Sequence, residues 1–317
     1  MKEYSRILVT GGAGFIGSHL VDRLMKDGYK VVVLDNFFSG NLENIKHHLE
    51  SGKFCLVKGD VRNSDIIKET VRNVDAVFHL AAIVSVPLSI KKPLLVNDVN
   101  VRGTLNLLEA SSKADVKRFI YISSCAVYGE ANRLPIDESC PTNPVSPYAV
   151  SKLAAEHYCK VFHENYGLNT VCLRYFNVYG PRQAKNLYSG VIIQFIDRLK
   201  QGKPPVIYGD GEQTRDFVHV KDIVEANMLA LNSQRSAGHV INVGSSESTT
   251  INNLANLLME FFDQTHLKPV HRAPREGDIR NSYADIAKAE KMLGYKPKIK
   301  LKEGISVLLK SQCEVQL

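Results

Sequence analysis

The sequence predicts an α/β protein in which helices cover both faces of a parallel sheet. Two observations predict this class. Short apolar runs rich in β-branched residues alternate with longer amphipathic segments as far as residue 180. The length of 317 residues also suits one large domain or two closely joined ones. A strand–helix–strand alternation of this kind favours a doubly wound sheet over a sandwich or a helical bundle.

The predicted elements follow in order along the chain. Strands are expected where apolar runs end in a polar residue or glycine, at residues 6–10, 29–35, 54–60, 75–82, 116–124, 169–177 and 239–244. Helices are expected over residues 14–28, 101–113, 148–167 and 248–261. A hydroxyl side chain stands where the last of these helices begins, as a helix N-cap does.

The alternation loosens after residue 180, where proline and glycine cluster at 202–213. We therefore predict a main domain over residues 1–176, whose sheet and helices also receive about 216–246. Residues 177–215 and 247–317 are expected to form a smaller C-terminal lobe that binds substrate.

Composition and charge exclude several classes of protein. No apolar run reaches the roughly 18 residues of a membrane span, and the N-terminal segment lacks the pattern of a signal peptide. The six cysteines contain no Cys-x-x-Cys pair, so we expect a reducing cytoplasm and no zinc site. The net charge is +7, but basic residues are interspersed with acidic ones, so we expect no nucleic-acid partner. A solvated surface and an anionic small substrate both remain open.

A glycine-rich turn follows the first predicted strand. The segment "TGGAGFIG" places Gly11, Gly14 and Gly17 between that strand and a helix, where backbone amides can approach a pyrophosphate. Asp35 ends the second strand, where a carboxylate accepts a hydrogen bond from a ribose 2′-hydroxyl and repels a 2′-phosphate. No arginine follows Asp35 until Arg62. The pattern predicts a Rossmann-type sheet that binds NAD rather than NADP; simple turn chemistry is the alternative.

A serine, a tyrosine and a lysine form a second group. Ser123 and Ser124 end the strand at 116–124, and Tyr148 and Lys152 are spaced to share one face of a helix. A nearby ammonium group and a positively charged nicotinamide would favour the tyrosine phenolate, which makes the tyrosine a usable base at neutral pH. Ser124 would then hydrogen-bond the reacting oxygen. The alternative is that Tyr148 packs in the core and Lys152 extends to solvent.

Four motifs together resemble one family. The segments "TGGAGFIG", "SSCAVYG", "YAVSK" and "RYFNVYGPR" resemble the extended short-chain dehydrogenase/reductase family, and within it the nucleotide-sugar 4-epimerases of the UDP-glucose/UDP-galactose type. The resemblance runs from about residue 6 to about residue 305. It implies tightly bound NAD, a UDP-sugar substrate and a transient 4-keto intermediate. It also implies a homodimer formed through helices near 97–113 and 148–166.

The resemblance also assigns residues. It implies that Ser124, Tyr148 and Lys152 are catalytic. The residues that it implies near the cofactor are Gly11, Gly14, Phe15, Ile16, Gly17, Asp35, Asn36, Ser39, Gly40, Asp60, Val61, Leu80, Ala81, Ala82, Asn100 and Phe176. For the sugar nucleotide it implies Asn177, Arg215, Arg275 and Asp278.

Related activities differ at identifiable positions. Sugar 4,6-dehydratases of this family carry Thr-Asp-Glu where this chain has Ser124, Cys125 and Ala126, so the acid and base of an elimination are missing. A UDP-glucuronate substrate stays open, because Lys185 and Arg182 could meet its carboxylate. A non-catalytic NAD-binding scaffold or an RNA-associated protein is the alternative from another class, and the intact serine, tyrosine and lysine argue against it.

One residue bears on the sugar. Ser282 follows Asp278 by four positions, and in the resembling epimerases this position borders the substituent at C2. A serine leaves room for an N-acetyl group that a tyrosine ring would fill. The expectation is that UDP-GlcNAc and UDP-GalNAc are interconverted as well as UDP-Glc and UDP-Gal. The alternative is that Tyr283 faces the sugar instead.

Overall fold

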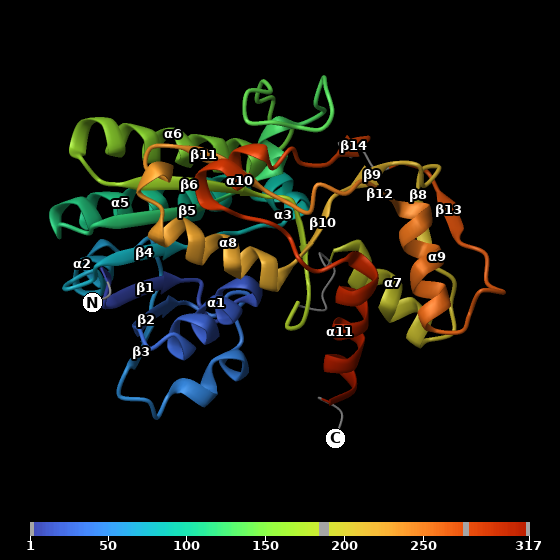
Figure 1. The fold of residues 1–317 in the computed structure, drawn as a ribbon, viewed down its shortest axis with the longest axis horizontal. Helices are drawn as coiled ribbons and strands as arrows, with labels where there is room; N and C mark the ends of the chain where they lie inside the picture. The colour runs from blue at the N-terminus through green and yellow to red at the C-terminus, as the bar shows by residue number, and fades with distance from the viewer. Residues whose placement is uncertain (1–2, 184–189, 275–278, 315–317) are drawn as a thin grey trace.

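A seven-stranded parallel sheet forms the centre of the protein (Figure 1). The structure is a computed structural model that describes residues 3–183, 190–274 and 279–314. The strand order is β11-β6-β5-β4-β1-β2-β3. The chain crosses between the two halves of the sheet next to β1, as in doubly wound folds. The predicted α/β class and Rossmann-type sheet are confirmed.

The strands of this sheet form where the sequence is apolar and β-branched. They are β1 (Arg6–Thr10), β2 (Lys30–Asp35), β3 (Phe54–Lys58), β4 (Ala76–His79), β5 (Arg118–Ser124), β6 (Thr170–Tyr175) and β11 (Val240–Val243). β4 ends at His79, three residues earlier than the sequence predicted. Because all seven strands run parallel, their carboxyl ends lie along one edge of the sheet.

Helices cover both faces of the sheet. On one face α1 (Phe15–Lys26), α8 (Val220–Asn232) and α10 (Ala287–Leu293) contribute to one core, which also contains Ile7 and Val9 of β1. The intervening Leu8 points to the other face, into the core of α2 (Ser64–Thr70), α4 (Pro93–Asn97), α5 (Gly103–Lys113) and α6 (Pro147–Tyr166). α3 (Val86–Lys91) packs beside α6. Successive side chains alternate between faces, so both faces of the strands are buried.

Local signals set the ends of the helices that matter most. The Ser146 hydroxyl accepts a hydrogen bond from the amide of Ala149 at 3.2 Å and caps α6, which then ends at the left-handed Gly167. The Thr250 hydroxyl caps α9 (Ile251–Phe261) in the same way, as predicted. α5 begins later than expected because a π-helical stretch, Asp98–Arg102, joins α4 to α5.

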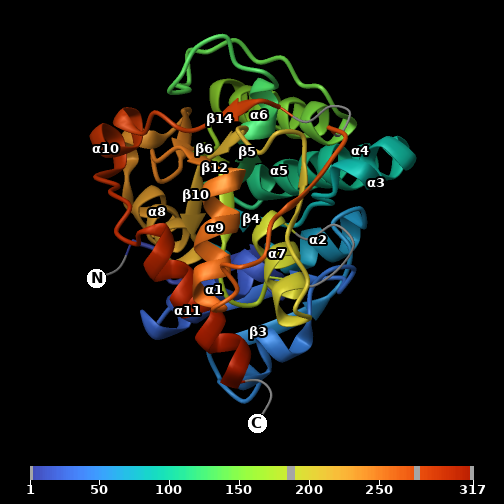
Figure 2. The same cartoon turned by 90° about the vertical axis from the view of Figure 1, so that its right-hand side faces the viewer.

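A smaller lobe lies beside the end of the sheet (Figures 1 and 2). Its core is formed mainly by α7 (Val191–Lys200), α9 and α11 (Leu301–Glu314). The short strands here are β7 (Asn177–Tyr179), β8 (Val206–Tyr208), β9 (Thr214–Arg215), β10 (Phe217–His219), β12 (Thr249–Thr250), β13 (Val270–Arg272) and β14 (Asn281–Ser282). Single helical turns lie at Leu42–Asn44, Lys46–His48, Cys125–Tyr128 and Gln234–Ser236.

The division into two units stays a proposal. Segment 284–295, which the sequence placed with the smaller lobe, packs with the sheet through Ala284, Ala289 and Tyr295. Its apolar side chains therefore belong to the larger core. Within the described ranges, no helix combines the length and the apolarity that crossing a membrane requires.

Candidate active site

The residues predicted to hold the cofactor gather at the carboxyl edge of the sheet. Gly11 follows β1, Asp35 ends β2, Asp60 follows β3, and residues 80–82 follow β4. Ser124 ends β5 in the next position, and Phe176 follows β6. Ligands of open α/β sheets bind at this edge. The parallel topology thus brings together segments that are far apart in the sequence.

The glycine turn is closely packed against its neighbours. Gly11 has a φ of +70°, and a Cβ placed on it would lie 2.8 Å from the amide nitrogen of Ala81. A Cβ on Gly17 would lie 2.1 Å from the carbonyl oxygen of Gly11. The amide of Gly14 donates to that same carbonyl at 3.1 Å, and no side chain caps α1. The first amides of α1, at Phe15 and Ile16, can therefore face an anion such as a pyrophosphate.

Asp35 holds the next turn against this glycine loop. Its carboxylate accepts hydrogen bonds from the amides of Ala13, at 2.9 Å, and Phe37, at 2.8 Å. Burial raises the pKa of Asp35, and these two hydrogen bonds oppose the increase. Gly40 lies so close that a Cβ there would be 2.9 Å from the carboxylate, while Asn36 and Ser39 are exposed beside it. The predicted contact of Asp35 with a ribose stays a proposal.

The first arginine after Asp35 is already engaged. Arg62 donates from Nη2 to Asp60 at 2.8 Å and pairs with Asp98 at 3.4 Å. Asn36 donates to the same Asp60 carboxylate at 2.8 Å. Hydrogen bonds from Arg62 hold the pKa of Asp60 well below its usual range. These pairs direct Arg62 towards acidic side chains, which agrees with a cofactor that has no 2′-phosphate.

Two buried polar side chains fix the segment that follows β4. His79 contacts the hydroxyls of Thr10 at 2.7 Å and Thr104 at 2.8 Å, and burial lowers its pKa to about 3. Asn100 Oδ1 accepts a hydrogen bond from the backbone amide of Ile83 at 2.8 Å, and Asn100 Nδ2 donates to the carbonyl of Ile83 at 3.0 Å. Asn100 was predicted near the cofactor. His79 was missed; a histidine inside an apolar strand, next to that segment, is the only sequence signal for it.

The structure brings Ser124, Tyr148 and Lys152 together. Tyr148 and Lys152 share the first turns of α6, and Ser124, at the end of β5, lies close enough to Tyr148 to lower its pKa. Lys152 Nζ donates to the carbonyl of Ile122 at 2.8 Å and lies 5.1 Å from the ring centre of Tyr121. Both Tyr148 and Lys152 are buried. The alternative of a lysine that extends to solvent is therefore wrong.

Burial governs the charges of this group in the protein alone. It raises the pKa of Tyr148 to about 12, and the nearby Ser124 hydroxyl only partly offsets the increase. Burial also lowers the pKa of Lys152 to about 8. The sequence predicted that the lysine ammonium and a bound nicotinamide together favour the phenolate; in the protein alone, desolvation of the phenolate dominates. The positive nicotinamide of NAD⁺ would add stabilisation of the phenolate when bound.

Cys125 follows Ser124 and contacts Ser282 of β14. Burial raises the pKa of the Cys125 thiol to about 11, and Ala126 donates its amide to the Ser124 hydroxyl at 3.2 Å. No carboxylate stands at position 125 or 126. Ser282 is buried with its Oγ 3.9 Å from the Cys125 sulfur. Ser282, the residue predicted to face the sugar, thus contacts the residue that follows Ser124 in the chain.

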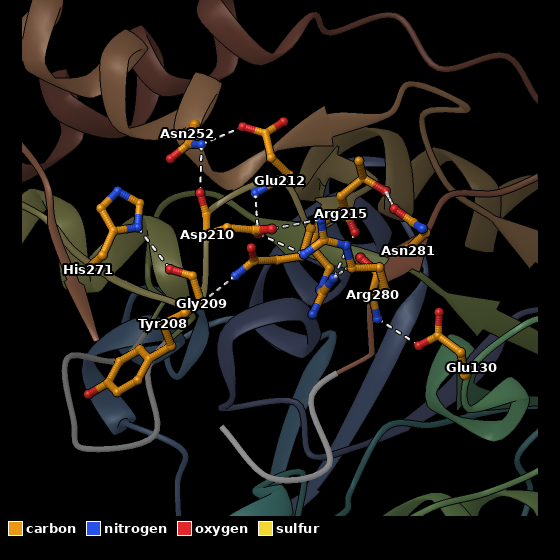
Figure 3. A network of polar contacts seen from close by, with 12 residues as sticks. Glu130, Tyr208, Gly209, Asp210, Glu212, Arg215, Asn252, His271, Arg280 and Asn281 are labelled. Carbon is orange, nitrogen blue, oxygen red and sulfur yellow. Dashed lines mark hydrogen bonds and ion pairs between the residues drawn. The ribbon is translucent and has the colours of Figure 1, made fainter. Parts of the chain in front are cut away.

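A polar network lines the smaller lobe near β9 and β14 (Figure 3). Arg215 donates to the carbonyl of Thr214 at 2.8 Å. Arg280, which the sequence did not single out, forms two hydrogen bonds to Asp210 at 2.7 and 2.9 Å. Its amide donates to Glu130 at 2.6 Å. Arg215 Nη1 also lies 3.4 Å from the carbonyl oxygen of Arg280.

Other predicted substrate residues lie apart from this network. Asn177 begins β7 and donates its amide to the carbonyl of Asp216 at 2.9 Å. Arg182 pairs with Asp22 of α1 at 2.8 Å, so its charge is already matched. The predicted residues Lys185, Arg275 and Asp278 lie outside the described residues.

Comparison with known proteins gives a consistent result. The model of the NAD dependent epimerase/dehydratase family matches residues 7–244. The chain is similar to a UDP-glucose 4-epimerase of Thermotoga maritima solved with UDP-glucose, with 39% identity, TM-score 0.93, and coverage of 98% of this chain and 100% of that one. It is also similar to a UDP-N-acetylglucosamine 4-epimerase of Methanobrevibacter ruminantium solved with UDP-N-acetylmuramic acid, with 41% identity, TM-score 0.93 and full coverage of both chains (100% and 100%).

A third similar structure was solved with the cofactor. It is a UDP-glucuronic acid 4-epimerase of Bacillus cereus in complex with UDP-glucuronic acid and NAD, with 34% identity, TM-score 0.89, and coverage of 98% and 99%. The family, the fold and the cofactor predicted from the sequence are all confirmed. The chain belongs to the NAD-dependent epimerase/dehydratase family of extended short-chain dehydrogenases/reductases, and it is an epimerase that works with NAD.

Proposed function

We propose that the protein is a 4-epimerase of UDP-hexoses that retains NAD through the reaction. The observation that carries this proposal is the meeting of Ser124, Tyr148 and Lys152 at the carboxyl edge of the sheet, the edge that also carries the glycine turn. Solved proteins that match the whole chain, and that bind UDP-sugars, support the substrate class.

The proposed reaction uses the tyrosine twice. Bound NAD would accept the hydride from C4 of the sugar and would later return it. Tyr148 removes the proton of the sugar 4-hydroxyl, and Ser124 holds the reacting oxygen by a hydrogen bond. The charged ammonium of Lys152 lies on the same helical face and favours the phenolate of Tyr148. After the 4-keto sugar has rotated in the site, hydride would return to the opposite face of C4, and Tyr148 would give the proton back to the 4-oxygen.

The uridine diphosphate would anchor the substrate while the sugar turns. Arg215 presents a planar guanidinium near β14 that can pair with diphosphate oxygens. Asn177, at the start of β7, would contact the sugar nucleotide. Binding energy from this remote half of the substrate would serve to position the reacting half.

The identity of the sugar depends on Ser282. Its side chain is small, and it lies against Cys125, one residue from Ser124. We propose that this position leaves room for an N-acetyl group, so that UDP-GlcNAc and UDP-GalNAc are substrates beside UDP-Glc and UDP-Gal. A uronate is less favoured, because Arg182 is already paired with Asp22.

A panel of UDP-sugars tests the function and its alternatives. Purified protein would be incubated with UDP-Glc, UDP-GlcNAc and UDP-glucuronate in turn, without added NAD, and the products separated by chromatography. We expect turnover of the first two, and Ser282→Tyr should lose only the acetylated pair. Turnover of UDP-glucuronate alone would favour the uronate epimerase, and bound NAD without any turnover would favour a non-catalytic scaffold.

We further propose a homodimer formed through α3, α4 and α6. These helices expose apolar side chains on the surface: Ile90 and Leu94 are 62% and 84% exposed, and Val150 and Val161 are 51% and 41% exposed. The exposed residues of α6 lie at helical spacing on one face. This proposed interface uses α3 and α4, which precede the helix near 97–113 that the resemblance implied. Leu94→Glu with Val150→Glu should yield a monomer in light scattering, whereas the wild type should be a dimer.

The cytoplasmic location also stays a proposal. The cysteines 55, 125, 140, 159 and 172 are all free thiols. Free thiols persist in a reducing compartment, so their state supports this location.

A further inference from the structure

A buried ion pair lies directly behind the catalytic lysine. Glu156 and Arg174 are only 4% and 5% exposed. Arg174 donates from Nε to Glu156 Oε1 at 2.9 Å and from Nη2 to Oε2 at 2.6 Å, while the hydroxyl of Ser123 also donates to Oε1. The guanidinium of Arg174 lies 4.6 Å from the ring centre of Tyr128. Both carboxylate oxygens are therefore engaged.

Stability alone does not account for this pair. Removing two charges from water costs free energy that their attraction only partly returns, and an apolar pair of similar volume is often as stable. The position of the pair indicates a second role. Ser123 and Arg174 face each other across β5 and β6, and Glu156 stands one helical turn after Lys152. The three side chains thus connect the strand that carries Ser124 with the helix that carries Tyr148.

The charges around Lys152 single out Glu156. The titratable groups around Lys152 and Glu156 come from four elements: Tyr148 and Cys159 on α6, His79 on β4, Tyr121 on β5, and Cys172 and Arg174 on β6. Burial lowers the pKa of His79 and raises that of Tyr121, and contact with Cys159 together with burial raises that of Cys172, so these three groups are neutral near pH 7. Burial lowers the pKa of Lys152, and the negative charge of Glu156 opposes it. Of the groups named here, Glu156 is the one carboxylate, and its side chain starts one helical turn after Lys152.

We propose that Glu156 is a positioning residue of the reaction: its carboxylate, held by Arg174 and Ser123, supplies the buried negative charge that keeps the Lys152 ammonium charged beside Tyr148. The inference rests on the proposed epimerase function. Without this carboxylate, Lys152 would lose its proton at a lower pH. The neutral lysine would no longer favour the phenolate, and the rate would fall on the alkaline side.

The pH dependence of kcat tests this role. We expect the alkaline limb of the profile to move down by about one pH unit or more in Glu156→Gln, because a buried opposite charge shifts a pKa by that order. The KM for the UDP-sugar should change little. Glu138→Gln is the control. Glu138 is half-buried, and its carboxylate accepts a hydrogen bond from the backbone amide of Asn242 at 2.7 Å. An alkaline limb that stays in place in Glu156→Gln would show that the residue is merely structural.

A second variant guards against misfolding, because Glu156→Gln leaves a buried arginine without its partner. Glu156→Gln combined with Arg174→Met removes both charges and should show the same alkaline shift. A titration of Lys152 in ¹³C-lysine-labelled wild type, assigned with Lys152→Met, gives a direct reading. It should find Lys152 charged at pH 7, and a neutral Lys152 at that pH overturns the inference. The titration needs no turnover, so its failure is distinguishable from failure of the epimerase proposal.

Discussion

The cofactor side and the substrate side of this protein are built in different ways. On the cofactor side, the turns are fixed by close backbone packing and by buried groups such as Asp35, which is 7% exposed. On the proposed substrate side, the polar groups of Figure 3 lie mostly on short strands and in the loops beside them. The side chains of Arg280 and Asp210 are 50% and 56% exposed.

This difference indicates that folding fixes the conformation of the cofactor side, whereas the exposed side chains of the substrate side can adjust to a ligand. A backbone turn without room for a Cβ cannot rearrange cheaply, whereas an exposed ion pair adds little stability and exchanges partners readily. Changes on the cofactor side should therefore alter folding and NAD content. Changes on the substrate side should alter the KM and leave both of these intact.

The largest effect is expected where the two sides meet. Tyr148→Phe should lower turnover by ~10³-fold or more, because it removes the group that moves the proton. Bound NAD and the unfolding temperature should stay near those of the wild type, since the ring still fills its buried site. Turnover and NAD content are measured on the same preparation. Wild-type turnover in this variant would remove Tyr148 from the reaction.

Next comes the glycine turn. Gly17→Ala places a Cβ 2.1 Å from the Gly11 carbonyl oxygen, so we expect loss of bound NAD and a cost of about 1–3 kcal/mol in the free energy of unfolding. Denaturant unfolding and the absorbance of released cofactor measure the two effects. Gly52→Ala is the control, because a Cβ there meets no atom within 4 Å. Equal behaviour of the two variants would refute the account of a rigid cofactor side.

A smaller effect is expected on the substrate side. Arg215→Gln should raise the KM for the UDP-sugar by roughly tenfold, the order expected for one lost charge-assisted contact. NAD content should not change. Arg280→Gln serves as the neighbouring comparison, because Arg280 is held by Asp210. A loss of bound NAD in Arg215→Gln would contradict the separation of cofactor binding from substrate binding.

The smallest effect concerns pH and His79. The unfolded chain binds a proton at this histidine below its ordinary pKa of 6.5, whereas the folded protein does so only near its lowered pKa of about 3. Within that window the unfolded state holds more protons, so the free energy of unfolding should fall as the pH falls. His79→Gln should show a weaker dependence in urea unfolding. The same slope in both proteins would speak against a neutral buried His79.

The sequence predicted the features that depend on residues close together in the chain. The glycine turn, β1 at its observed limits and the hydroxyl cap of α9 all follow from local spacing. The sequence could not predict the pairing of Glu156 with Arg174 or of Arg280 with Asp210, because each depends on segments that only the fold brings together. It also could not predict how strongly burial raises the pKa of Tyr148 in the protein alone, because the extent of burial is a property of the packed structure.

The central claim is that C4 of the sugar is oxidised and reduced by the same bound cofactor. The direct test uses a UDP-hexose carrying deuterium at C4, incubated with the protein in ordinary water without added NAD. The product is then examined by NMR and mass spectrometry. The account predicts the 4-epimer with its deuterium retained at C4. A 4-epimer whose deuterium has been replaced by solvent hydrogen would contradict it.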